Sequence, residues 1–147
     1  MLEKLNKMED QLISFETAKL AKEKEFNISC ENVYAETLEH EDYDRHTGIE
    51  YDVEYRAPRI LNRDCLYEYT KFVCEAPTQS LLQKWIREEY DIIVLIDYFY
   101  WDDCFKFNIG GKSVNPDKLK GIDFSIEFDL YEDALEAGLF EALNLIK

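Results

Sequence analysis

The sequence predicts an α+β domain in which an antiparallel sheet of three or more strands is packed on one face by two or three helices. One observation is that residues 77–90, PTQSLLQKWIREEY, repeat apolar side chains at helical spacing. Another is that residues 91–100 and 104–111, DIIVLIDYFY and CFKFNIGG, favour strands and flank a short polar break. A helix followed by a β-hairpin is therefore the centre of the prediction, and 147 residues fit one domain over 1–147.

The N-terminal half is less regular. Residues 2–12 carry apolar side chains at helical spacing, and Ser14 is a candidate N-cap for a helix over 15–26. Residues 27–50 are rich in charge and poor in apolar side chains, so we expect an irregular segment there. Short strands are predicted at 51–55 and 66–74. We interpret 31–75 as an acidic, partly irregular connection or insertion within the domain.

The hairpin and the segments after it supply the predicted core. Residues 92–96 are all apolar, which predicts a strand in the middle of a sheet or one covered on both faces. Residues 121–130, GIDFSIEFDL, alternate strictly and predict a third strand antiparallel to the hairpin. Its expected inner face consists of Ile122, Phe124, Ile126, Phe128 and Leu130.

A final helix is predicted over 131–146, with Asp129 and Glu132 as a capping box. Gly138 falls inside this helix and costs about 1 kcal/mol relative to alanine. That cost is tolerable where the helix crosses close to the sheet.

Charge and cysteine content narrow the function classes. Thirty-two acidic and 17 basic residues give a net charge of −15, which argues against direct binding to nucleic acid or adsorption to anionic membrane. No apolar run reaches the ~20 residues that span a bilayer. The four cysteines form no C-x-x-C pair and the N-terminus is charged, so a cytoplasmic location with reduced thiols is expected. We expect Cys30, Cys65 and Cys74 to be buried.

Three segments carry a resemblance: SFETAKLAKEKEF (14–26), APTQSLLQKWIREEY (76–90) and YEDALEAGLFEALNLI (131–146). They resemble a group of small uncharacterised proteins of Bacteroides, its phages and mobile elements, which have a PTQSLLQKW-type helix and a C-terminal YEEAL-type helix. The resemblance covers about a third of the chain and leaves 31–75 unmatched. It implies an accessory protein of phage or mobile-element type, and it carries no activity or catalytic residue.

Residues suited to chemistry are few. His40 and His46, within EHEDYDRH, are weak metal candidates, because a six-residue histidine spacing matches no standard zinc motif. Asp102 and Asp103 near Asp97 have ligand types suited to a hard cation, but a polar hairpin turn explains them more simply. No phosphate-binding glycine loop, G-x-S-x-G or H-E-x-x-H motif occurs. Catalysis is not excluded by this absence, but the sequence offers no catalytic residue, and we expect no cofactor.

The run Tyr98-Phe99-Tyr100-Trp101 is explained for the most part by core packing. Alternation nonetheless places Tyr98 and Tyr100 opposite Phe99 and Trp101, so one pair is a candidate for the surface, and exposed aromatics are favoured in protein interfaces. Tyr98, Tyr100 and Trp101 are the candidate interface residues. The leading hypothesis is a non-enzymatic protein that binds a protein partner, with a second copy of the chain as one candidate partner. The alternatives are an acidic inhibitor that mimics nucleic acid and blocks a host defence protein, and a metal-dependent enzyme that uses the His40–His46 region.

Overall fold

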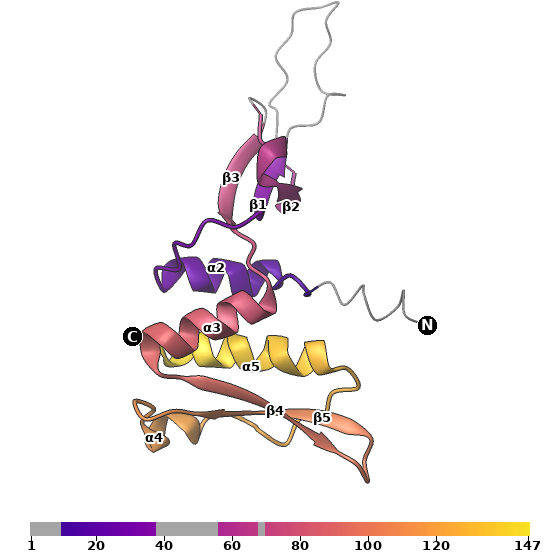
Figure 1. Ribbon diagram of the computed structural model, residues 1–147, viewed down its shortest axis with the longest axis vertical. Coiled ribbons are helices and arrows are strands. Elements are labelled where there is room, and N and C mark those ends of the chain that lie inside the picture. The colour runs from indigo at the N-terminus through magenta and orange to yellow at the C-terminus, as the bar shows by residue number, and fades with distance from the viewer. Residues whose placement is uncertain (1–9, 38–55, 68–69) are drawn as a thin grey trace, which may run out of the picture.

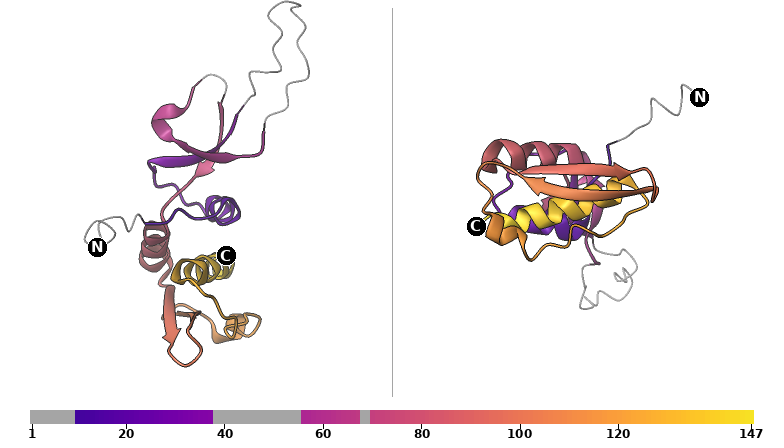
Figure 2. Two further views of the ribbon diagram at one scale, coloured as in Figure 1. Left: turned by 90° about the vertical axis from the view of Figure 1, so that its right-hand side faces the viewer. Right: turned by 90° about the horizontal axis from the view of Figure 1, so that it is seen from below.

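The computed structural model describes residues 10–37, 56–67 and 70–147. Three layers follow one another along its longest axis (Figure 1): a three-stranded sheet, a layer of helices and a two-stranded hairpin. The left view in Figure 2 shows the same helices between the sheet and the hairpin. The predicted α+β class is confirmed, with antiparallel pairing in both sheets.

The chain alternates between strands and helices along its length. The helices are α2 (Phe15–Glu23), α3 (Gln79–Tyr90), α4 (Pro116–Leu119) and α5 (Tyr131–Leu145). The strands are β1 (Asn32–Thr37), β2 (Arg59–Asn62), β3 (Thr70–Glu75), β4 (Ile93–Phe99) and β5 (Cys104–Gly110), with a short 3₁₀ helix, η2 (Arg63–Cys65), after β2.

Side-chain caps define the start of two predicted helices. The Ser14 hydroxyl accepts a hydrogen bond from the Thr17 amide at 3.3 Å and begins α2. The Thr78 hydroxyl accepts one from the Leu81 amide at 3.2 Å and begins α3. Asp91 ends α3 in a left-handed conformation, with φ of 54°. Both predicted helices are therefore confirmed. The one predicted over 15–26 ends earlier, at Glu23, and the one predicted over 77–90 begins later, at Gln79.

The last helix is confirmed, but its predicted capping box is wrong. α5 begins after Leu130, which provides no side-chain hydrogen bond to the first turn. Two acidic residues, Glu132 and Asp133, lie in that turn. Their negative charge interacts favourably with the helix dipole and partly replaces a capping side chain.

The predicted hairpin is confirmed, whereas the strand predicted over 121–130 is wrong. β4 and β5 pair continuously from Ile93–Gly110 to Phe99–Cys104. In the following segment, one isolated bridge joins Phe105 to Phe128. The cause is local, because the Asp123 carboxylate accepts hydrogen bonds from both the amide and the hydroxyl of Ser125, at 2.9 and 2.5 Å. These side-chain bonds compete with a strand ladder and turn the backbone.

The apolar side chains of 121–130 nonetheless pack on the core in part. Ile122, Phe124 and Phe128 are half-buried, and the Phe124 ring lies 5.6 Å from that of Phe107. Ile126 and Leu130 are 47% and 56% exposed. The alternating pattern thus marks a coil that covers one edge of the hairpin.

The three-stranded sheet has the order β2-β1-β3 and comes from the part of the chain that we expected to be irregular. That expectation is wrong for 32–37, where Val33 and Ala35 are completely buried. β3 confirms the strand predicted over 66–74, shifted toward its end. The strand predicted at 51–55 lies outside the described residues. An ion pair between Arg63 and Glu75 joins η2 to β3.

A carboxylate on α5 connects the three long helices. Glu136 Oε1 accepts hydrogen bonds from the Ser14 amide at 2.8 Å and the Thr17 hydroxyl at 2.7 Å. Glu136 Oε2 accepts one from Gln79 Nε2 at 3.2 Å. Thr17 and Gln79 are almost completely buried, so both depend on protein partners for their hydrogen bonds. Glu136 thereby fixes the N-terminal turns of α2 and α3 against α5.

Close packing between α5 and the hairpin explains Gly138, because a Cβ there would lie 2.7 Å from Val94 Cγ1 and 3.0 Å from Phe107 Cβ. We predict that Gly138→Ala lowers the free energy of unfolding by about 1 kcal/mol. Overpacking costs about 1–3 kcal/mol, and its midpoint of about 2 kcal/mol exceeds the roughly 1 kcal/mol gain in helix propensity. Urea unfolding measures the difference, and a variant as stable as the wild type would contradict the close approach.

We predict that Glu136→Ala lowers the free energy of unfolding by about 2–3 kcal/mol, because the Ser14 amide and the Thr17 hydroxyl lose their acceptor and Gln79 Nε2 keeps only the Glu132 carbonyl. Glu136→Gln keeps a side-chain oxygen that accepts from Ser14 and Thr17, so it should lower the free energy of unfolding by less than Glu136→Ala does. Glu141→Ala is the matched control, since Glu141 also lies on α5 but makes no ion pair or hydrogen bond with the described residues. It should change stability by less than about 0.5 kcal/mol in the same urea experiment. Equal losses in the Glu136 and Glu141 alanine variants would refute the proposed connection.

Candidate protein-binding surface

The hairpin has one buried and one exposed face. Val94, Phe107 and Ile109 face α5 and are buried. The opposite face and the turn expose an apolar group that we call the hairpin surface, consisting of Ile93, Leu95, Phe99, Tyr100 and Trp101. Trp101 is 93% exposed, Tyr100 75% and Leu95 52%. An exposed apolar group of this kind is characteristic of an interaction site.

This exposure corrects the prediction that β4 is central or covered on both faces. In the part of the chain that the structure describes, β5 is the single strand paired with β4, and 121–130 forms no strand. The helices cover the inner face alone. The signal for the exposed face was present in the sequence as five successive apolar residues, 92–96. It was attributed to burial, and Ile93, Leu95 and Phe99 were missed as surface candidates.

The three predicted interface residues lie near one another but in different settings. Tyr100 and Trp101 occupy the turn, with ring centroids 5.5 Å apart. Tyr98 is 51% exposed, and its ring lies 5.2 Å from that of Phe105. Its hydroxyl donates a hydrogen bond to Asp103 at 2.7 Å, and this bond raises the pKa of Tyr98. Tyr100 and Trp101 are therefore the more accessible anchors.

Negative charge surrounds the apolar group. Residues 91–111 contain four aspartates, at 91, 97, 102 and 103, and one basic residue, Lys106. Lys106 Nζ lies 4.6 Å from the centre of the Phe99 ring and 3.7 Å from Glu127. Its charge is therefore engaged within the chain. The hairpin surface is suited to a partner that combines apolar and basic groups.

The predicted metal candidates have different outcomes. His40 and His46 lie outside the described residues. Asp103 is bonded to Tyr98, whereas Asp102 lies beside Cys104 and Glu127. Both aspartates lie in the hairpin turn, as the simpler explanation predicts, and the ligand cluster contains Asp102 but not Asp103.

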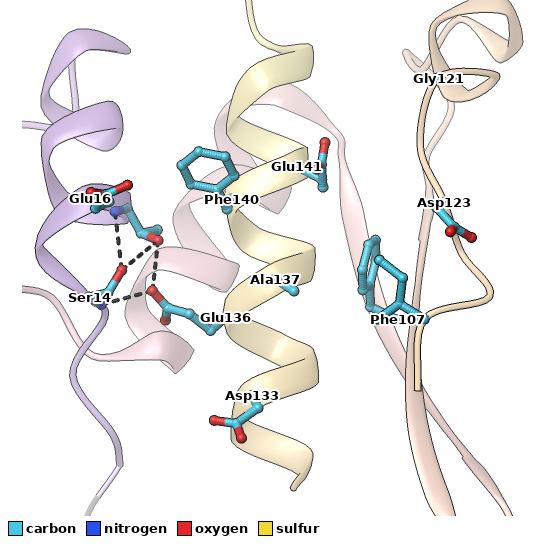
Figure 3. A pocket seen from close by; sticks show the side chains of 12 residues that line it. Ser14, Glu16, Phe107, Gly121, Asp123, Asp133, Glu136, Ala137, Phe140 and Glu141 are labelled. Atoms are coloured by element: carbon cyan, nitrogen blue, oxygen red, sulfur yellow. Dashed lines mark hydrogen bonds between the residues drawn. The ribbon is translucent and has the colours of Figure 1, made fainter. Parts of the chain in front are cut away.

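Apart from the hairpin surface, the structure has a groove between α2, α5 and the segment 121–126 (Figure 3). This groove has a volume of about 590 Å³, and its walls include Phe107 and Phe140. Five of its lining residues are acidic: Glu16, Asp123, Asp133, Glu136 and Glu141. Glu136 is already bonded to α2 and α3, and the hydrogen bonds from Ser125 lower the pKa of Asp123. No histidine, cysteine, lysine or arginine is among the described residues that line the groove.

Comparisons with known proteins provide no relative. The chain matches no protein-family profile, no curated protein and no solved structure. Across 10–37, 56–67 and 70–147, none of the helices has the length and apolar character needed to cross a bilayer.

The cysteines divide into buried and exposed thiols. Cys30 and Cys74 are buried as predicted, but Cys65, in η2, is exposed, so its predicted burial is wrong. Burial, with a further effect from Glu75, raises the pKa of Cys30 to about 11. Burial likewise raises the pKa of Cys74 to about 11.

We predict that a thiol reagent at pH 8 modifies Cys65 first. At that pH, a pKa of about 11 leaves roughly a hundredfold less thiolate than an ordinary cysteine has, in addition to the steric protection of burial. The rates at Cys30 and Cys74 should rise about tenfold per pH unit up to that pKa, as long as the chain stays folded. Peptide mass mapping of the time course measures each site. Modification of Cys30 or Cys74 at the Cys65 rate would contradict their burial.

Proposed function

We propose that this chain is a non-enzymatic protein-binding protein and that the hairpin surface contacts the partner. The supporting observation is the exposure of Tyr100 and Trp101 at the end of a strand whose outer face is also apolar. Tryptophan and tyrosine are enriched among the residues that dominate binding energy in protein interfaces. The hairpin is held on α5, so these side chains project from an ordered support.

The partner that fits this surface carries a basic rim around an apolar centre. The aspartates at 97, 102 and 103 attract such a rim and repel acidic surfaces. A second copy of this chain has the same net charge of −15 and is the less favoured occupant. The resemblance of the helical segments supports a phage or mobile-element setting for this accessory role.

Salt dependence distinguishes this role from mimicry of nucleic acid. A mimic binds through many carboxylates and loses affinity steeply as salt increases. Binding centred on Trp101 depends mainly on apolar burial and should persist at high salt.

We predict that Trp101→Ala weakens capture of the partner by about thirtyfold or more, equivalent to a hot-spot loss of about 2 kcal/mol. The measurement uses immobilised chain and lysate of the native host at low and high salt, with mass spectrometry of the retained proteins. A protein retained by the wild type, lost with Trp101→Ala and carrying a basic surface supports the proposal.

Ile60→Ala is the matched control, because Ile60 is also an exposed apolar residue, 45% accessible, but lies on the distant three-stranded sheet. It should retain the same proteins as the wild type. The role is refuted if Trp101→Ala and Ile60→Ala retain identical sets. Sedimentation of both variants tests self-association, and a dimer abolished by Trp101→Ala would identify a second copy as the partner.

A further inference from the structure

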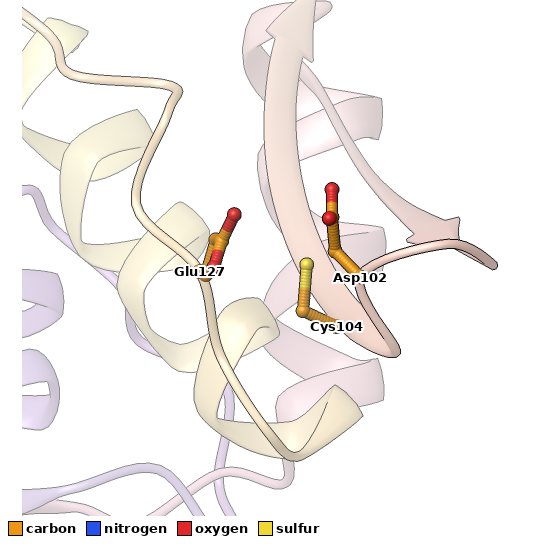
Figure 4. Close-up of side chains that lie close together, drawn as sticks. All are labelled: Asp102, Cys104 and Glu127. Carbon is orange, nitrogen blue, oxygen red and sulfur yellow. The ribbon is translucent and has the colours of Figure 1, made fainter.

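Three ligand-type side chains meet beside the hairpin turn (Figure 4). Asp102 lies in the turn between β4 and β5, Cys104 is the first residue of β5, and Glu127 lies in the segment that leads to α5. One ligand atom from each, the sulfur and two carboxylate oxygens, lies within 4.8 Å of the others. Residues distant in sequence thus form one cluster.

Backbone pairing fixes this arrangement. Phe105 and Phe128 exchange two backbone hydrogen bonds, of 2.8 and 2.9 Å. Side chains alternate on either side of such a pair, so Cys104 and Glu127 project on the side opposite to the two phenylalanines. Their proximity therefore follows from the register and not from a chance side-chain rotation.

Cys104 provides the second observation. It is 3% exposed, and its thiol has no hydrogen-bond partner among the described residues. The Cys30 thiol, in contrast, donates to the Ile28 carbonyl at 3.3 Å. Figure 4 shows the Cys104 sulfur directed between the Asp102 and Glu127 carboxylates. A buried thiol without a hydrogen-bond partner thus points at two carboxylates. These three groups are all metal-ligand types, and burial holds the thiol in place.

Negative charge gathers around the Cys104 sulfur. The carboxylates of Asp102 and Glu127 lie beside it, and Lys106 Nζ lies 3.7 Å from Glu127. A divalent cation between the three ligand atoms would interact favourably with these two carboxylates.

We propose that Asp102, Cys104 and Glu127 bind a zinc ion. Zinc accepts thiolate and carboxylate ligands together, whereas magnesium and calcium prefer oxygen alone. Ordinary zinc–ligand distances place tetrahedral ligand atoms about 3.5 Å apart. The exposed Asp102 and Glu127 side chains rotate inward to reach this spacing, while Cys104 keeps its position. Three protein ligands leave one position for water.

The ion ties the hairpin turn to the segment before α5. In the described chain, backbone bonds between that segment and β5 are confined to the Phe105–Phe128 bridge. A second connection at Glu127 restrains the turn that carries Tyr100 and Trp101. The zinc site stands on its own geometry and does not depend on the proposed binding role.

Cobalt(II) titration of the reduced full-length chain tests the site, because cobalt replaces zinc and a bound thiolate gives a near-ultraviolet charge-transfer band. We expect this band in the wild type, and we expect added zinc to abolish it. Cys104→Ser should eliminate the band. Lys106→Gln should tighten cobalt binding severalfold, because it removes the competing cation.

Control variants separate this site from the other candidate ligands. Cys65→Ala and the double variant His40→Ala/His46→Ala should retain the full band. Asp102→Asn and Glu127→Gln alter exposed side chains and so preserve the fold, and each should weaken cobalt binding at least tenfold. The proposal is overturned if the wild type gives no band, if the band survives in Cys104→Ser, or if both carboxylate variants bind cobalt as tightly as the wild type.

Discussion

The carboxylate of Glu136 is the constraint on which the arrangement of the helices depends. It accepts hydrogen bonds from the N-terminal turn of α2 and from Gln79 at the start of α3. Thr17 is shielded from water, which makes the loss of its acceptor costly, and the equally shielded Gln79 would keep only its bond to the Glu132 carbonyl. With α5 fixed in this way, one side of the helix layer receives the three-stranded sheet and the other receives the hairpin (Figure 1).

The hairpin surface is a consequence of this layering. α5 approaches the inner face of β4 and β5 so closely that a Cβ at residue 138 would crowd Val94 and Phe107, and no helix of the described residues covers the outer face. The aromatic turn therefore projects at the end of the molecule opposite to the three-stranded sheet. Both the proposed protein contact and the proposed zinc site lie at this turn, since its position brings Cys104 next to Glu127.

Local patterns predicted the helices and the hairpin, because caps such as Ser14 and apolar periodicity act within a few residues. The prediction over 121–130 was wrong because the bonds from Ser125 to Asp123 favour a turn, although the alternation matches a strand. The sequence marked Tyr100 and Trp101 as interface candidates, but alternation alone does not decide which aromatic side chains of the run are exposed. The connection through Glu136 was not, because its donors lie 57 or more residues away and no spacing along the chain reports them.

Hydrogen exchange at the Ser14 amide tests the Glu136 connection most directly. This N–H donates to a side-chain carboxylate 122 residues away, whereas the nearby Ala18 amide donates to the Ser14 carbonyl within α2 at 2.9 Å. We expect the Ser14 amide to exchange at least about tenfold more slowly than an unstructured peptide amide and to show protection comparable to that of Ala18. Exchange of Ser14 at the unstructured rate, with Ala18 still protected, would contradict the central role of Glu136.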